Sequence, residues 1–123
     1  MNKRKVDDLI PKAYEVLKSS GIVERDENGN ATNKINKAWR GQISSFGASI
    51  AQGSLIAAVS FFSKKGQADV DRSKLMEAIK QLLELESSLY EYVKDECGRK
   101  AKKENIINAA VALKLAMNLY NLE

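Results

Sequence analysis

Helical spacing of apolar residues runs through almost the whole chain, and it restricts the fold more than any other feature of the sequence. Apolar side chains recur every three or four residues, whereas the period-two alternation typical of half-buried strands is nearly absent. A single proline, Pro11, interrupts the pattern. Because 123 residues suit one domain, we predict an all-α fold, a compact single-domain bundle of five to six helices over residues 1–123.

Turn and cap residues divide this pattern into separate helices. Residues 24–33 lack an apolar period and include the turn pair Asn28-Gly29, so they are predicted to form the longest loop. Residues 55–62 are apolar on every face, which predicts a buried helix at the centre of the core. The predicted helices run to about Ser20, carry Ile35 to Ile50, span Leu55 to Phe62, carry Leu75 to Val93 with a break near Ser87, and extend from about Glu104 to Tyr120.

The residues that most catalytic and metal centres need are missing. The chain has no histidine, which removes the usual general base and most zinc sites. Its single cysteine, Cys97, excludes an intrachain disulfide and is expected to be a half-buried structural thiol. Residues 26–30 have the spacing that opens a calcium loop, but Ala31 and Lys37 stand where such a loop needs glycine and a bidentate glutamate. We therefore expect no cofactor, no metal and no enzymatic activity.

The sequence also lacks the signals of a membrane or secreted protein. No apolar run approaches the roughly 20 residues that span a bilayer. The basic start, Lys3 to Lys5, is followed by Asp7 and Asp8, where a signal peptide needs its apolar stretch. We expect a cytoplasmic protein without membrane contact, which agrees with the low cysteine content.

Positive charge is concentrated in the first half of the chain. Residues 1–65 contain 11 Lys/Arg and 6 Asp/Glu, a net charge of +5, whereas residues 66–123 contain 9 and 10, a net charge of −1. A basic half can attract either the phosphates of a nucleic acid or an acidic protein partner. The charge alone leaves both alternatives open.

Five basic residues form the candidate binding site. Lys34, Lys37 and Arg40 are spaced by three on the predicted second helix and would therefore share one face. Lys64 and Lys65 follow the predicted buried helix. Nucleic-acid contact and ordinary solvated charge are equally compatible with this face.

Other basic residues and one aromatic residue frame this candidate site. Lys3, Arg4 and Lys5 are expected to form a flexible arm, and residues 98–103 a basic linker. Trp39 precedes Arg40, which would suit stacking on a base. Trp39 also belongs to the apolar stripe of its helix, so we favour packing in the core.

The segment from Trp39 to Ser63 resembles the central signature of a known family. That family is the small helical subunit, the fifth, of the type III-B CRISPR effector, the Cmr complex. Its aromatic-basic pair corresponds to Trp39-Arg40, its Phe-Gly-Ala-x-Ile helix to residues 46–50, and its final apolar helix to residues 55–62. The resemblance covers about a quarter of the chain.

This resemblance implies a non-catalytic subunit of an RNA-guided antiviral complex. Copies of the chain would stack beside other Cmr subunits and help to hold guide RNA and target RNA in a basic groove. Arg40 would be the best candidate for RNA contact, with Lys37, Lys64 and Lys65 next on position and charge. The alternative is a helical protein–protein interaction module that binds an acidic partner without RNA.

Overall fold

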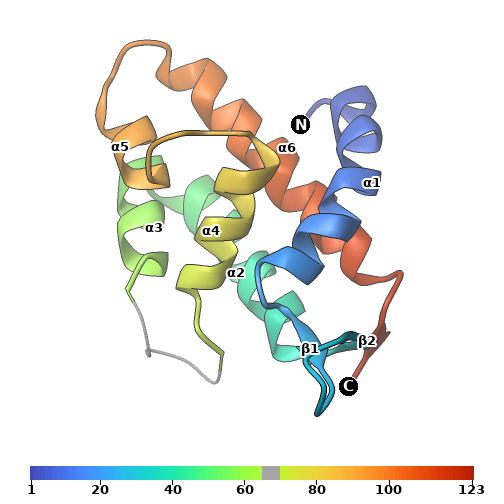
Figure 1. The fold of residues 1–123 in the computed structure, drawn as a ribbon. Helices are drawn as coiled ribbons and strands as arrows, with labels where there is room; N and C mark the ends of the chain where they lie inside the picture. Colours follow the sequence, from blue (N-terminus) through green and yellow to red (C-terminus); the bar gives the residue numbers. More distant parts are fainter. Residues whose placement is uncertain (65–69) are drawn as a thin grey trace.

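The computed structural model describes residues 1–64 and 70–123 (Figure 1). Within them the fold is mainly α-helical, which confirms the predicted fold class, but a small sheet accompanies the helices. In chain order the elements are α1 (Lys3–Ser19), β1 (Val23–Arg25), β2 (Ala31–Ile35), α2 (Ala38–Gln52), α3 (Leu55–Phe62), α4 (Ser73–Leu82), α5 (Leu89–Lys94), α6 (Arg99–Met117) and β3 (Asn121–Leu122).

Helix α6 forms the centre of the core, and α1, α2, α4 and α5 all pack against it. Ala109, Ala112 and Ala116 are completely buried along it, and their small side chains let the neighbouring helices approach closely. Just beyond α6, the Tyr120 ring stacks on Tyr14 of α1 at 4.6 Å between centroids. The hydroxyl of Tyr120 donates to the Tyr14 carbonyl at 2.8 Å. These contacts fix the end of α6 to α1.

Two strands of a three-stranded sheet, β1 and β2, occupy the region predicted to be a loop and the start of the second helix. Strand β1 pairs with β2 in antiparallel orientation, and β2 pairs with β3 in parallel orientation. The prediction was wrong at Ile35, which is buried as the last residue of β2 and does not lie on α2. Strands this short offer too few residues for a period-two pattern, so pairing with the distant β3 decides their conformation.

A tight turn joins β1 to β2. The Asp26 carboxylate accepts from the backbone N–H groups of Asn28 and Asn30, both at 2.9 Å. Gly29 has a φ of 80°, a left-handed conformation that glycine adopts without strain. The Asp26 side chain therefore closes this turn, which lies at the turn pair Asn28-Gly29 that the sequence predicted.

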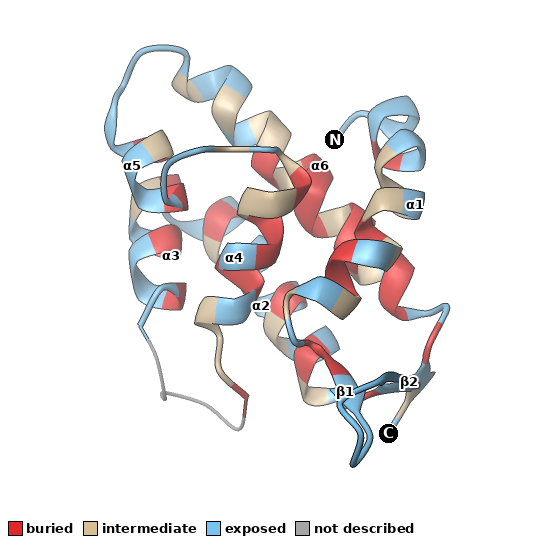
Figure 2. Ribbon diagram, viewed as in Figure 1, coloured by how far each residue is buried: buried red, intermediate tan, exposed pale blue. Residues whose placement is uncertain are grey.

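Helix α3 is less buried than its composition predicts. Leu55, Val59 and Phe62 are buried, but Phe61 is 60% exposed. Figure 2 shows both buried and exposed stretches along α3. The Arg72 guanidinium lies over the Phe61 ring at 4.7 Å. Because α3 lies at the edge of the bundle in Figure 1, and none of the described helices covers its outer side there, an apolar residue remains on the outer face. The prediction that α3 is the centre of the core was wrong.

The remaining helix boundaries follow local signals. The predicted break near Ser87 is confirmed, and the Ser88 hydroxyl caps α5 by accepting from the Glu91 amide at 3.2 Å. Helix α6 begins at Arg99, earlier than predicted, directly after Gly98 in a left-handed conformation. The basic linker predicted at residues 98–103 is therefore mostly the first turn of α6.

The N-terminal basic residues belong to α1 and do not form a flexible arm. The Asn2 side chain caps α1 by accepting from the Lys5 amide at 3.2 Å. The terminal amine pairs with Glu104 of α6 at 2.8 Å, and the Asn2 amide donates to Asn108 Oδ1 at 2.9 Å. These contacts hold the N-terminus against α6. No helix in the described part of the chain is long and apolar enough to cross a bilayer.

Candidate nucleic-acid interface

Lys37 and Arg40 lie together at the start of α2. Lys37 occupies the cap position, Arg40 lies in the first turn, and both side chains are exposed. Among the described residues neither of them forms an ion pair. The positive end of the helix dipole lies at the same place, so two cations and the dipole add to one local positive potential.

Lys34 lies beside this pair, but on β2 instead of α2. The prediction that Lys34, Lys37 and Arg40 share one helix face was therefore wrong, because residues 31–35 are extended and pair with β3. The Lys34 ammonium is 3.8 Å from the Glu123 carboxylate, which partly neutralises it. We call Lys34, Lys37 and Arg40 the α2 basic corner.

Lys64 is exposed and lies away from the α2 basic corner. It lies two residues after the end of α3, and that end is on the opposite side of the molecule from β2 in Figure 1. Lys65 lies outside the described residues. The structure thus brings together three of the five predicted binding residues and separates a fourth from them.

Trp39 is 6% exposed and packs in the hydrophobic core. This confirms the favoured interpretation and removes Trp39 as a surface on which a base could stack. Arg40, the next residue, points outward because consecutive positions on a helix differ by about 100°.

A groove runs between α2 and α6 next to the α2 basic corner. Its volume is about 290 Å³, and its floor is largely apolar. Both helices reach the sheet at the same end of the molecule, because α2 follows β2, α6 precedes β3, and β2 pairs with β3. The residues that line the groove include Ser44, Gly47, Ala48 and Ala51 of α2 and Val111 and Lys114 of α6.

Lys114 is a basic residue that sequence reasoning missed. It lies in the last turn of α6 and lines this groove, so it approaches the sheet end of α2 from a segment more than 70 positions away in the sequence. No local pattern could have placed it there, because only the packing of α6 against α2 brings the two ends together.

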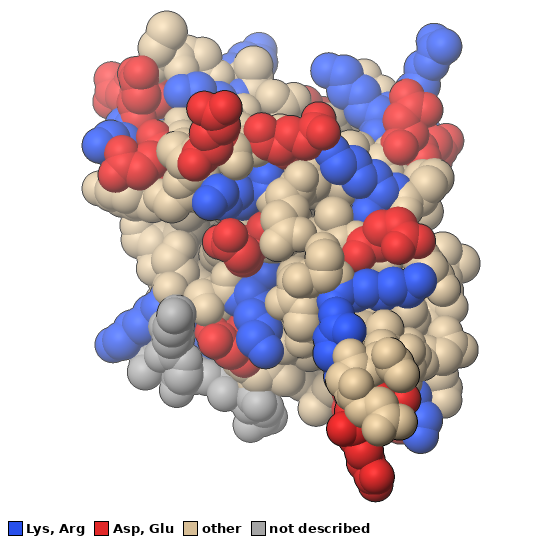
Figure 3. Space-filling view, in the orientation of Figure 1, with Lys and Arg blue, Asp and Glu red and all other residues tan. Residues whose placement is uncertain are grey.

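Many other basic residues are already engaged within the molecule. Arg25 donates to the carbonyls of Gly29 and Lys18 at 2.9 and 2.8 Å, which ties the hairpin to α1. Lys102 lies over the Tyr92 ring at 5.2 Å. Basic and acidic side chains alternate over the face drawn in Figure 3, with no single large basic patch there. The candidates for ligand binding are therefore the exposed basic residues that have no partner among the described residues.

The remaining chemically reactive groups lie apart from the α2 basic corner. No cluster of three or more His, Cys, Asp or Glu in the described part of the chain could hold a metal ion. Cys97 is exposed, so the expectation of a half-buried thiol was wrong; it lies in the loop between α5 and α6, where no helix covers it. Burial raises the pKa of Tyr120, and the Glu91 carboxylate raises the pKa of Lys94, but both groups lie outside the α2 basic corner.

Comparisons with known proteins leave the family open. No protein-family model matches this chain, and no significant match was found among the curated proteins or the solved structures. The geometry of the α2 basic corner therefore carries the functional argument, together with the resemblance of residues 39–63.

Proposed function

We propose that this chain is a non-catalytic, RNA-binding small subunit of a type III-B CRISPR (Cmr) ribonucleoprotein. In this proposal several copies stack beside the other subunits and help to hold guide RNA and target RNA. The observation that carries it is the α2 basic corner, where Lys37 and Arg40 are exposed, lie one turn apart, and have no acidic partner among the described residues.

Two features of the fold support this assignment. The segment that resembles the family signature forms α2 and α3, which pack against each other. Within it Trp39 is buried and Arg40 is exposed, so the aromatic-basic pair divides into one core residue and one surface cation. A surface cation at the positive end of a helix suits phosphate contact, which gives affinity without reading sequence.

The test compares RNA binding by the intact protein and by Lys37→Glu/Arg40→Glu at several salt concentrations. Loss of two phosphate contacts should lower low-salt affinity by about tenfold or more and reduce the slope of log K against log salt by about 1.4. Fluorescence anisotropy with a labelled single-stranded RNA measures both. The matched control is Lys100→Glu/Lys103→Glu, which changes net charge equally at the far end of α6.

Equal losses in the two variants would mean that only net charge matters, and would remove the α2 basic corner as the site. Circular dichroism must show that each variant is folded. Co-purification of the tagged protein from its native host would then separate the Cmr assignment from general RNA binding, because only the former predicts short guide RNAs and the other subunits.

A second candidate function is a protein–protein interaction module with an acidic partner. The apolar groove between α2 and α6 favours it, since the basic residue Lys114 lines the groove and would face a helix laid into it. This alternative predicts co-purifying protein without RNA, and a loss of binding when Ala48 is enlarged to leucine.

A further inference from the structure

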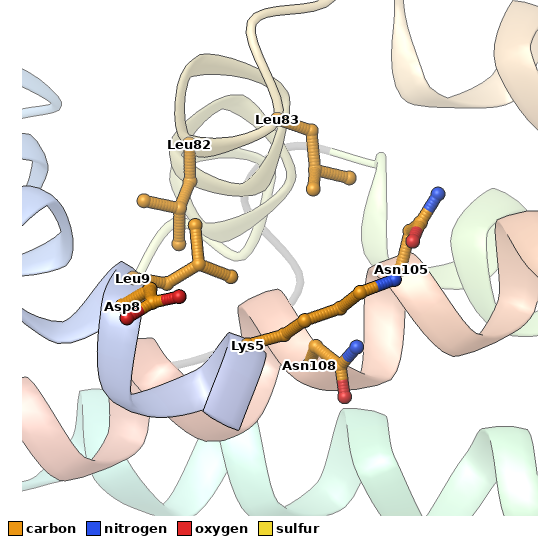
Figure 4. A pocket seen from close by; sticks show the side chains of 7 residues that line it. All are labelled: Lys5, Asp8, Leu9, Leu82, Leu83, Asn105 and Asn108. Carbon is orange, nitrogen blue, oxygen red and sulfur yellow. The ribbon is translucent and has the colours of Figure 1, made fainter. Parts of the chain in front are cut away.

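A second cavity lies on another side of the molecule, between α1, α4 and α6, and has a volume of about 360 Å³. Figure 4 shows three leucines on one side, Leu9, Leu82 and Leu83, and the polar side chains of Lys5, Asn105 and Asn108 on the other. Asp8 lies beside Leu9. The cavity therefore has an apolar wall opposite a polar one.

Asn108 is the unusual residue in this cavity, because it is polar and only 1% exposed. Its Oδ1 accepts from the Asn2 amide at 2.9 Å. Since a backbone N–H can only donate, this bond fixes the orientation of the side-chain amide and directs Nδ2 away from Asn2. Nδ2 has no hydrogen-bond partner among the described residues. A buried donor without an acceptor is unfavourable, so an acceptor brought to Nδ2 would be stabilised there.

Lys5 brings a positive charge to the same cavity, which it lines from α1. Nδ2 of Asn108 is closed to solvent, and Lys5 and Asn108 line the same cavity. Because the Lys5 side chain is exposed and has a flexible stem, it can move to admit a ligand into the cavity. An incoming anion would meet the ammonium of Lys5 first and the amide of Asn108 behind it.

Asp8 restricts the charge that this cavity accepts. Its carboxylate lines the cavity on the same helix as Lys5 and repels further negative charge. A phosphate dianion would therefore be disfavoured, whereas a single carboxylate needs only Lys5 and Asn108. The three leucines then cover an apolar body of modest size.

We propose that this cavity binds a small monocarboxylate with a branched or short linear apolar body. The carboxylate accepts from Asn108 Nδ2 and pairs with the Lys5 ammonium, while the hydrocarbon part packs on Leu9, Leu82 and Leu83. This site is separate from the α2 basic corner, and the proposal does not depend on RNA binding.

The probe is 4-methylpentanoate, and its neutral amide serves as the matched control ligand. Titration into ¹⁵N-labelled protein should shift the side-chain NH₂ signals of Asn108, with a Kd on the order of 1 mM for a ligand of this size. The amide should bind at least fivefold more weakly. Equal binding of acid and amide, or unmoved Asn108 signals at 20-fold excess over that Kd, would overturn the proposal.

Three substitutions locate the site. Lys5→Met keeps the stem and removes the charge, and should weaken binding at least fivefold. Lys3→Met, on the same helix but outside the cavity, should leave affinity unchanged. Asn108→Asp retains the acceptor for Asn2 but replaces the donor with a negative charge, so binding should be lost.

Because Asn108→Asp also affects the core, Asp8→Asn provides a variant at an exposed position. It removes the repulsion and should tighten binding of the carboxylate about twofold to fivefold. Weaker binding by Asp8→Asn, or unchanged binding by Lys5→Met, would contradict the proposed geometry. A peptide that ends in leucine is a second probe. If it binds more than tenfold more tightly than the free acid, the ligand is a peptide chain terminus and the small-molecule proposal is wrong.

Discussion

The starts of α2 and α6 both carry basic residues, and Arg99 at the start of α6 is engaged within the molecule in a way that Lys37 and Arg40 at the start of α2 are not. At the start of α6, Arg99 donates to the carbonyls of Val93 and Lys94 at 3.3 and 3.4 Å and lies 3.8 Å from the Glu96 carboxylate. At the start of α2, Lys37 and Arg40 have neither a carboxylate nor a ring partner among the described residues.

This difference shows that local charge in the sequence is a poor measure of available charge. A cation at the start of a helix opposes the helix dipole and is unfavourable for stability unless a partner compensates it. Arg99 has such partners, whereas Lys37 and Arg40 are exposed to solvent. Residues kept in an unfavourable position are better candidates for binding than residues that stabilise the fold. The following predictions test that distinction.

The largest expected effect on stability is at Arg99. Arg99→Ala removes charge-assisted bonds to two backbone carbonyls at the turn between α5 and α6 and should lower the free energy of unfolding by about 1–2 kcal/mol. Urea unfolding followed by circular dichroism measures this. A loss below about 0.3 kcal/mol would mean that Arg99 is as free as Arg40, and the contrast between the two helix starts would disappear.

The next effect has the opposite sign and occurs at the start of α2. Lys37→Glu replaces an uncompensated cation with an anion at the positive end of the helix dipole, and should raise the free energy of unfolding by about 0.3–1 kcal/mol. The same variant should bind RNA more weakly. Lys37→Gln separates the two contributions, since it removes one charge without adding another. If Lys37→Glu is destabilising, the lysine must have a stabilising contact.

The smallest effect concerns the ion pair between Lys34 and Glu123. Glu123→Gln should lower the free energy of unfolding by less than about 0.5 kcal/mol, because both side chains are about half exposed. It should also release Lys34 and strengthen low-salt RNA binding by about twofold. Asn118 is exposed just after α6 and offers a control. Asn118→Asp adds a negative charge near the same end of α6. Weaker RNA binding by Glu123→Gln would exclude Lys34 from the interface.

Long-range pairing accounts for most of what the sequence could not predict. Strand β3 has two residues, yet its parallel pairing with β2 keeps Ile35 off α2 and moves Lys34 away from the helix. A partner more than 80 positions distant in the sequence leaves no local signal. Lys114 lines the groove, and Asn108 accepts from the Asn2 backbone through Oδ1, only because distant segments pack together. No local pattern in the sequence marks either position.

Local patterns were sufficient wherever a residue's neighbours along the chain decide its structure. Helical spacing determined the mainly α-helical class and the stripe that buries Trp39. A cap residue marks the boundary between α2 and α3, where the Ser54 hydroxyl accepts from the Ala57 amide at 3.1 Å. Tertiary structure decided which cations remain free, which face of α3 is covered, and where polar groups meet in cavities. The physical reason is that caps and periodicity act within a few residues, whereas ion pairing, burial and cavity shape depend on segments that only folding brings together.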